Sequence, residues 1–140
     1  MNKRKVQSVI FYCDTEGKKH FLLLKLNKKR GFFWQSVTGG VDDGEDFIQA
    51  ALREAQEETQ IKTDNIKNII ETNYEFSFTD QYENQVLEKV FIIEAKSSWC
   101  VVIDPHEHVE FKWVHEDNIN EKSVKFESNF QAIKIALELK

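Results

Sequence analysis

The chain has 140 residues, 41% of them hydrophobic and 31% charged, with a single proline. At this length we expect one domain over residues 1–140, able to bury about 68–70% of its unfolded surface around one core. The net charge of −5 at pH 7 argues against non-specific nucleic-acid binding as the main activity.

Alternating apolar residues and turn signals predict β-strands in the first forty residues. Residues 6–12 and 20–26 are predicted strands that flank the turn Asp14-Thr15-Glu16-Gly17. Residues 32–37 form a short aromatic strand candidate, which leads into the Gly39-Gly40 turn.

A helix is predicted directly after this turn. It should begin near Asp46, whose side chain can cap the first turn, with Gln49 as its capping-box partner. Helical spacing then separates an apolar face from a carboxylate face. The expected buried face carries Ile48, Leu52 and Ala55, and the other side carries Glu54, Glu57 and Glu58.

The second half of the chain predicts more strands and a closing helix. Apolar or alternating stretches predict four strands, at residues 73–78, 89–95, 99–103 and 109–114. Residues 128–139 begin with Ser-Asn and continue with apolar residues at helical spacing. The order of strands, helix, strands and helix predicts a mixed sheet covered by helices, in the α/β or α+β class.

No window approaches the ~20 apolar residues of a membrane span. The basic start MNKRK is followed by a stretch too short and too polar for a signal peptide. Cys13 and Cys100 show no metal, redox or disulfide spacing. We therefore expect a cytoplasmic location and no membrane partner.

Three glutamates on one face of the predicted helix point to a metal site. Glu54, Glu57 and Glu58 lie three and four residues apart, so they repel one another at about 0.2–0.5 kcal/mol for each pair. A bound divalent cation would reverse the sign of that term. The alternative is a solvated acidic face, but the Gly-Gly turn and Arg53 argue against it. Carboxylates without sulfur or imidazole neighbours select Mg²⁺ or Mn²⁺, and Mg²⁺ commonly serves phosphoryl chemistry.

The spacing of this segment forms a recognisable pattern. Gly39 is followed after five residues by Glu45, and after seven more by the run Arg53-Glu54-Ala55-Gln56-Glu57-Glu58-Thr59-Gln60-Ile61. It resembles the Nudix box, G-x5-E-x7-R-E-U-x-E-E-x-G-U, at the opening glycine and every charged position. Ala55 is smaller than usual, and Gln60 stands where the pattern has glycine. A glycine there ends the helix in a left-handed conformation, so Gln60 costs about 1 kcal/mol or the helix ends differently.

The resemblance implies an α/β/α sandwich with the box as a loop–helix–loop, and hydrolysis of a nucleoside diphosphate linked to another group. It assigns the divalent cations to Glu54, Glu57 and Glu58, with a backbone carbonyl near Gly39 as a further ligand. Glu54 is the candidate general base. The remaining box residues are implied to be structural: Gly39, Gly40 and the pair Glu45–Arg53, although Arg53 could also meet phosphate.

The run Phe33-Trp34-Gln35-Ser36-Val37-Thr38-Gly39 is similar to that of bacterial dihydroneopterin triphosphate pyrophosphatases, the Nudix enzymes of folate biosynthesis. The similarity recurs at residues 107–113 and 129–133. In that subgroup a carboxylate outside the box completes the metal site, and Glu107 holds the matching position. The alternative for Glu107 is a glutamate on a loop surface.

Substrate contacts are expected ahead of the box, from Lys25 and Arg30 in the basic stretch 25–30 and from Trp34 and Gln35. The alternatives are a solvated basic loop and core aromatics. A zinc cluster of three histidines is disfavoured because the spacing fits no structural zinc pattern; these are His106, His108 and His115.

These features together predict a Mg²⁺-dependent pyrophosphohydrolase of a small nucleotide-like triphosphate, with dihydroneopterin triphosphate as the leading substrate. The products would be a monophosphate and pyrophosphate. Alternatives are a (d)NTP hydrolase, a nucleoside-diphosphate-sugar hydrolase, an RNA 5′-pyrophosphohydrolase or a non-catalytic nucleotide-sensing Nudix module. The expected partner is a small phosphorylated molecule rather than nucleic acid, and a homodimer is compatible with the family.

Overall fold

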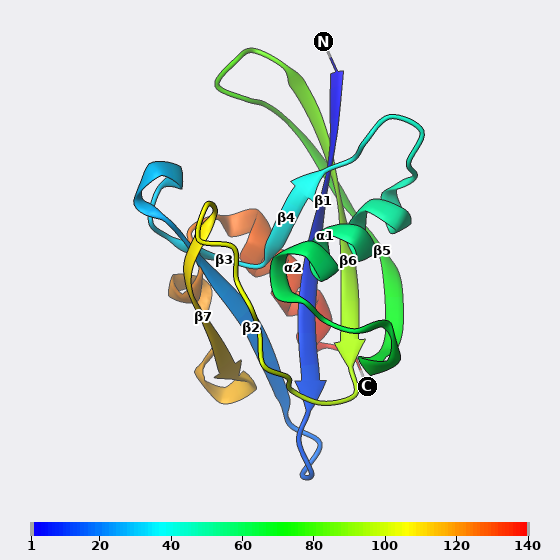
Figure 1. Ribbon diagram of the computed structural model, residues 1–140, viewed down its shortest axis with the longest axis vertical. Helices are drawn as coiled ribbons and strands as arrows, with labels where there is room; N and C mark the ends of the chain where they lie inside the picture. Colours follow the sequence, from blue (N-terminus) through cyan, green and yellow to red (C-terminus); the bar gives the residue numbers. More distant parts are fainter. Residues whose placement is uncertain (1, 140) are drawn as a thin grey trace.

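A mixed, strongly twisted β-sheet organises the computed structural model, which describes residues 2–139 (Figure 1). Within these residues the sheet has seven strands: β1 (Asn2–Cys13), β2 (Lys19–Leu26), β3 (Trp34–Gln35), β4 (Val37–Gly40), β5 (Ile66–Thr79), β6 (Gln85–Ala95) and β7 (His108–His115). Two α-helices accompany it, α1 (Phe47–Thr59) and α2 (Glu127–Leu137). Short 3-10 turns occupy parts of the connections.

The long strand β1 changes partners along its length. The strand order is β3-β2-β1-β6-β5, with β4 paired to β1 and β7 paired to β2. Only the β1–β6 pair is parallel among the described strands; the other pairs are antiparallel. The first half of β1 pairs with β4, where Val6 lies opposite Gly39, and its last residues pair with β2. This pairing anchors the glycine turn directly in front of α1.

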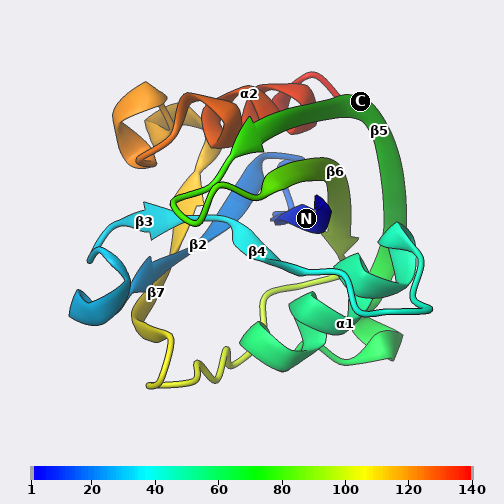
Figure 2. The same ribbon diagram turned by 90° about the horizontal axis from the view of Figure 1, so that it is seen from above.

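The two α-helices cover opposite faces of the sheet (Figure 2). Because side chains alternate along a strand, neighbouring residues serve different cores. On the α2 face Val9 and Phe11 pack with Ile133, and on the α1 face Ile10 packs with Ala55. The expected α/β/α arrangement around a mixed sheet is therefore confirmed.

Most predicted elements are confirmed. The strands predicted at 6–12, 20–26, 73–78, 89–95 and 109–114 all form, and the closing helix forms over Glu127–Leu137. Helix α1 begins as expected, because Asp46 accepts a hydrogen bond from the Gln49 backbone N–H at 2.8 Å and Gln49 returns one at 2.9 Å. Such a capping box satisfies amide groups that the helix itself leaves free.

Two strand predictions were wrong. Residues 32–37 do not form one strand: Phe32 has φ 57°, and the chain forms β3 and β4 instead as separate short strands. Residues 99–103 form no strand. The apolar residues of this segment, Trp99 and Val101, pack over the core on the α1 side instead. The Trp99 indole N–H donates a hydrogen bond to the Thr59 carbonyl at 2.8 Å.

The buried face of α1 differs in part from the prediction. Ala55 is fully buried as predicted and Leu52 is half-buried, but Ile48 is 41% exposed, and Ala50 and Ala51 are fully buried instead. Alanines let the helix lie close to the sheet, where the Ser8 hydroxyl reaches the Ala51 carbonyl. This rotation turns one of the glutamates inward, so the carboxylate face is not wholly separate from the core.

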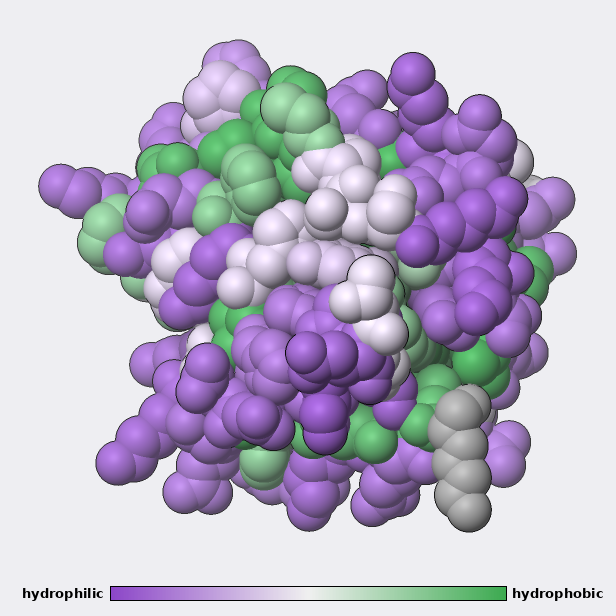
Figure 3. Space-filling model, turned by 90° about the horizontal axis from the view of Figure 1, so that it is seen from below, coloured by the Kyte–Doolittle hydropathy of each residue, from purple (hydrophilic) through white to green (hydrophobic). Residues whose placement is uncertain are grey.

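The face of the molecule at the end of the sheet opposite the glycine turn is largely hydrophilic, with apolar side chains gathered in small groups (Figure 3). Across residues 2–139, neither helix combines the length and the apolar character needed to cross a membrane.

Candidate active site

Arg53 ties the glycine-rich loop to α1. Its guanidinium binds Glu45 through two hydrogen bonds, Nε to Oε2 at 2.8 Å and Nη2 to Oε1 at 3.0 Å, and Nη2 also donates to the Gly40 carbonyl at 2.8 Å. On the helix side Nη1 donates to Glu54 at 2.9 Å and Glu57 at 3.2 Å. The Arg53 hydrogen bonds lower the pKa of Glu45 to about 2. Forked charge-assisted bonds of this kind fix geometry as well as charge, so the loop and the helix are held as one unit.

Gly39 is where β4 passes directly over the Glu54 carboxylate. A Cβ atom built on Gly39 would overlap that carboxylate, whereas one on Gly40 would meet nothing within 4 Å. Gly39 does not have a left-handed backbone. The glycine is therefore needed here for space rather than for conformational freedom.

Glu58 is the glutamate that α1 turns inward. It is only 3% exposed, and its Oε2 atom has no hydrogen-bond partner. Burial, reinforced by the negative charges of Glu54 and Glu107, raises its pKa to about 9. Burial also raises the pKa of Glu54, against the opposing effect of Arg53. Glu57 is largely exposed, with 60% of its side-chain surface accessible.

Two residues from the segment before and at the start of β7 complete this group. Ligand atoms of Glu58, Glu107 and His108 all lie within 4.8 Å of one another. Asn27 holds this segment in place by donating its backbone N–H to the Glu107 carbonyl at 2.9 Å. The Glu107 carboxylate lies 3.5 Å from the Arg30 guanidinium. Glu107, which lies outside the box in sequence, is therefore a neighbour of the box residue Glu58 in space.

His108 was not predicted as part of this site. It is 1% exposed, its Nε2 lies 3.6 Å from Glu58 Oε1, and burial lowers its pKa to about 4. The imidazole is therefore neutral at physiological pH. His108 and His115 fall in different side-chain groups, the latter beside Asp14 and His20, so the three histidines weighed as a zinc cluster do not gather. The signal for His108 was its place directly after Glu107.

The donor set fits a divalent cation. In residues 2–139, the buried side-chain atoms without a hydrogen-bond partner are Glu58 Oε2 and both ring nitrogens of His108. An unsatisfied buried polar group costs about 1–3 kcal/mol, more when it is charged. All three such atoms lie in this one cluster, among carboxylate oxygens that suit hard cations. A cation between these carboxylates would offset both the missing partner of Glu58 and the mutual repulsion.

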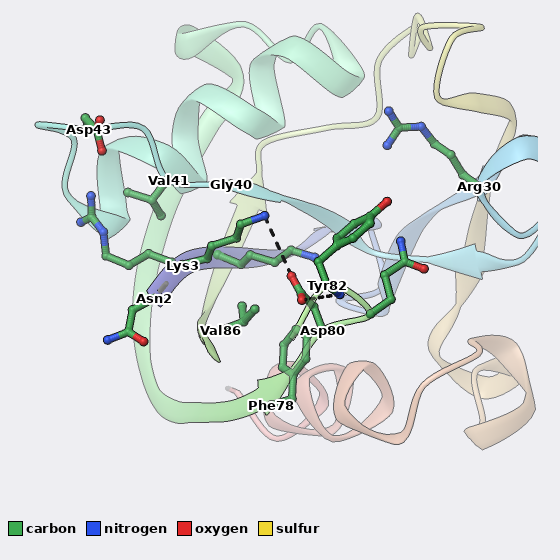
Figure 4. A pocket seen from close by; sticks show the side chains of 13 residues that line it. Asn2, Lys3, Arg30, Gly40, Val41, Asp43, Phe78, Asp80, Tyr82 and Val86 are labelled. Atoms are coloured by element: carbon green, nitrogen blue, oxygen red, sulfur yellow. Dashed lines mark hydrogen bonds and ion pairs between the residues drawn. The ribbon is translucent and has the colours of Figure 1, made fainter. Parts of the chain in front are cut away.

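A basic cavity of about 730 Å³ lies beside the loop. Figure 4 shows Lys3, Arg30 and Gly40 around it, with the ring of Tyr82 projecting between them. The chain segment Lys3-Arg4-Lys5 was not predicted to take part, because its charges lie far from the box in sequence. The signal was the basic start of the chain, which β1–β4 pairing brings alongside Gly40. Two carboxylates, Asp43 and Asp80, also line the cavity, and Lys3 lies 3.9 Å from Asp80. The four basic residues of the lining outnumber them, so the cavity favours an anionic substrate.

A second cavity, the aromatic cavity, has a volume of about 460 Å³. It is lined by Lys5, Gln7, Gln35, Thr38, Phe76, Phe78, Glu88, Phe126, Ser128 and Asn129. Gln35, one of the expected substrate contacts, donates to the Thr38 hydroxyl at 3.1 Å.

The other expected substrate contacts are distributed unevenly. Arg30 lines the basic cavity. Trp34 lines neither cavity; it packs against the α2-side core, and the Lys112 ammonium lies 4.1 Å from its ring centre. Lys25 also lines neither, because its ammonium lies over the Phe32 ring at 3.9 Å. The position of Trp34 fits the alternative of a core aromatic. Lys25 fits neither the substrate contact nor the solvated loop, because it lies in β2 with only 20% of its side-chain surface accessible.

Comparisons with known proteins point to one family. A sequence model of the NUDIX domain matches residues 3–132. An RNA pyrophosphohydrolase from Novosphingobium aromaticivorans is 28% identical over 131 residues, covering 84% of this chain and 81% of the relative. The dihydroneopterin triphosphate diphosphatase of Escherichia coli K12 is 32% identical over 116 residues, covering 76% and 73%.

The fold is also similar to that of a solved structure. The E. coli dihydroneopterin triphosphate pyrophosphohydrolase superposes with a TM-score of 0.77 at 27% identity, covering 94% of this chain and 92% of that one. The relatives differ in the substrates that their names state. The glutamate cluster, the Arg53-braced loop and the domain match together show that the chain belongs to the NUDIX family, as a hydrolase of phosphoanhydrides.

Proposed function

We propose that the protein is a Mg²⁺-dependent pyrophosphohydrolase of a small nucleotide-like triphosphate. The observation that carries the proposal is the buried Glu58 carboxylate, which has an oxygen without a partner and lies close to two further acidic residues, Glu54 and Glu107. Such an arrangement is costly in the absence of a cation. Arg30, whose guanidinium lies 3.5 Å from the Glu107 carboxylate, also lines the basic cavity, which supports an anion site next to the proposed metal site.

Each residue has a proposed role. Glu54, Glu57, Glu58 and Glu107 would hold the cation, with the Gly39 carbonyl as a further ligand. Oxygen donors favour Mg²⁺, with Mn²⁺ as the alternative. The expectation that these carboxylates have no imidazole neighbour was wrong, because His108 Nε2 lies 3.6 Å from Glu58 Oε1. A bound ion of this kind neutralises substrate phosphates and lowers the pKa of an attacking water.

The remaining chemistry falls to side chains that the loop holds in place. Glu54, fixed by Arg53 beneath Gly39, is the candidate general base. Arg53 positions the glutamates through its hydrogen bonds to both the loop and the helix. Arg30, between Glu107 and the basic cavity, is placed to bind a phosphate. Because phosphoanhydride hydrolysis depends mainly on positioning and charge stabilisation, these contacts would supply most of the rate.

Dihydroneopterin triphosphate is the leading substrate, which would place the protein in folate biosynthesis. The 32% identical E. coli relative with that substrate in its name supports this choice. The 28% identical RNA pyrophosphohydrolase supports a 5′-triphosphate RNA end as the competing substrate. Cytoplasmic location stays a prediction from the sequence, and a homodimer stays compatible with the family.

The test is pyrophosphate and phosphate release with Mg²⁺ from dihydroneopterin triphosphate, the dNTPs, a dinucleoside polyphosphate, a nucleotide sugar and a 5′-triphosphate RNA. Glu58→Gln runs beside the wild type. We expect pyrophosphate release from the pterin substrate, lost in the variant. Preference for another substrate would keep the reaction and reject the folate assignment. If the wild type hydrolyses none of them, the result would favour the alternative of a nucleotide-sensing Nudix module.

A further inference from the structure

The aromatic cavity and the basic cavity are neighbours. Lys5 and Phe78 line both of them. Strand β4 runs between the aromatic cavity and the glutamates, since Thr38 lines the cavity while the next residue, Gly39, lies against Glu54. A volume of about 460 Å³ falls within the range of about 300–1,000 Å³ that is usual for small-molecule pockets. A substrate with its phosphates in the basic cavity could therefore extend its heterocycle into the aromatic one.

A buried carboxylate lines the aromatic cavity. Glu88, on β6, is 5% exposed. Gln7 donates its Nε2 to Glu88 Oε2 at 2.8 Å, and Asn129 donates its Nδ2 to Gln7 Oε1 at 2.8 Å. Asn129 is fixed in turn by Ser36, through hydrogen bonds of 2.9 Å to the hydroxyl and from the backbone N–H. This chain of bonds across β1, β6 and α2 sets the direction of the carboxylate.

One oxygen of this carboxylate is free to bind a ligand. No residue in the described range 2–139 donates a hydrogen bond to Glu88 Oε1. Burial raises the pKa of Glu88, against the opposing effects of the Gln7 hydrogen bond and the Lys5 charge. This oxygen is not among the buried atoms without a partner, so it is accessible from the cavity that Glu88 lines, and N–H donors placed there would stabilise the ionised carboxylate.

The walls of the cavity suit a flat ring. Phe76 and Phe78 line it from β5, and Phe126 lines it from the segment before α2. Phe126 and Phe78 are among the exposed large hydrophobic residues. The Phe33 ring lies edge-on to the Phe126 ring, with 5.3 Å between the ring centres. Exposed aromatic faces around a polar group favour a planar heterocycle with a polar edge.

We propose that Glu88 determines substrate specificity by binding the 2-amino-4-oxopyrimidine edge that guanine and pterin share. That edge presents a ring N–H and an adjacent amino group side by side, which match the two oxygens of a carboxylate. Adenine, cytosine and uracil each place an acceptor where this edge has one of its donors, and that acceptor would face the carboxylate. The proposal rests on the proposed function, because it assigns the heterocycle of the same triphosphate substrate.

Binding of monophosphates tests the inference without any hydrolysis. Dissociation constants for GMP and IMP, measured calorimetrically with Mg²⁺, isolate the amino group, because IMP lacks it. We expect the wild type to bind GMP about 10- to 100-fold more tightly than IMP, as a hydrogen bond to a charged group predicts. Glu88→Gln should remove this preference, because its amide turns a donor toward the donors of the ligand. The control Glu94→Gln, on the same strand but not lining the cavity, should keep it.

Neopterin monophosphate forms a further arm of the experiment. If neopterin monophosphate binds more tightly than GMP, the ligand that presents this edge is a pterin. If it binds more weakly than GMP, the ligand is a guanine nucleotide. Both results support the role of Glu88. Equal binding of GMP and IMP by the wild type would overturn the inference, even if the variant cannot be purified in folded form. A GMP preference that persists in folded Glu88→Gln would also overturn it. If the wild type binds GMP more tightly than IMP but hydrolyses none of the triphosphates, the proposed function is rejected and this inference still stands.

Discussion

Replacing Gly39 by alanine should inactivate the protein without unfolding it. The added methyl group would overlap the Glu54 carboxylate, which is the end of a flexible side chain rather than part of the backbone. The side chain can move away, so the fold should tolerate the change. The new position of the carboxylate, however, is no longer the one that Arg53 now sets.

The expected magnitude follows from the size of the displacement. Carbon atoms in ordinary contact lie about 3.5–4.0 Å apart, so the carboxylate must retreat by at least about 1 Å. A misplacement of about 1 Å in a catalytic group can lower the rate about 100-fold. We therefore expect kcat/KM to fall about 100-fold in Gly39→Ala, with a higher Mg²⁺ concentration needed for half-maximal rate. Stability should change by less than about 1 kcal/mol, since alanine suits an extended strand at least as well as glycine.

Gly40→Ala provides the matched control. It makes the same chemical change one residue along the same strand, where an added Cβ meets nothing within 4 Å. Pyrophosphate release at varied Mg²⁺ concentration and urea unfolding curves should be measured for both variants. Activity of Gly39→Ala within about twofold of the wild type, or an equal loss in Gly40→Ala, would contradict the role of Gly39 in placing the Glu54 carboxylate.

Three other predictions follow from the same helix. In metal-free protein, the pKa of Glu58 rises from 4.5 in the unfolded chain to about 9, so the folded state loses stability as the pH rises through this window. In urea melts, the free energy of unfolding of Glu58→Gln should therefore increase by about 3 kcal/mol relative to that of the wild type as the pH is raised from 5 to 7. The free energy of unfolding of Glu57→Gln should change little relative to the wild type over the same range. Gln60 has φ 59° and ψ 28°, so Gln60→Gly should raise the free energy of unfolding by about 1 kcal/mol; an unchanged melt would contradict strain there. Arg53→Lys cannot bind Glu45 through a fork and should lower kcat at least about tenfold, while wild-type kcat would show that the brace is dispensable.

The helix and its chemistry could be predicted because their signals are local. The Asp46–Gln49 capping box, the spacing of the glutamates and the pairing of Glu45 with Arg53 each depend on residues within one loop and one helix. Local geometry is nearly fixed once a helix is assigned. Strands β1 and β2 could also be predicted from local sequence, because successive side chains of a strand point alternately to the two cores.

Errors arose where side-chain size decided the packing. Helical periodicity placed Ile48 inside, but the sheet accepts the alanine face of α1, because small residues allow the closer approach. The same rotation buries Glu58, which no pattern of polar residues could indicate. Residues 99–103 have the apolar character of a strand, yet their side chains cover the core without a strand partner.

The sequence alone determined the family, the reaction class and the box residues, because these reside in one contiguous pattern whose spacing is itself the signal. Only the tertiary structure decided which distant residues join that pattern. It placed His108 beside Glu58, the basic start of the chain beside Gly40, and Glu88 in a network with Gln7 and Asn129. Strand pairing between segments far apart in sequence makes these contacts, and no local spacing specifies them. The residue that we propose to determine specificity, Glu88, therefore lies outside the sequence pattern that identifies the family.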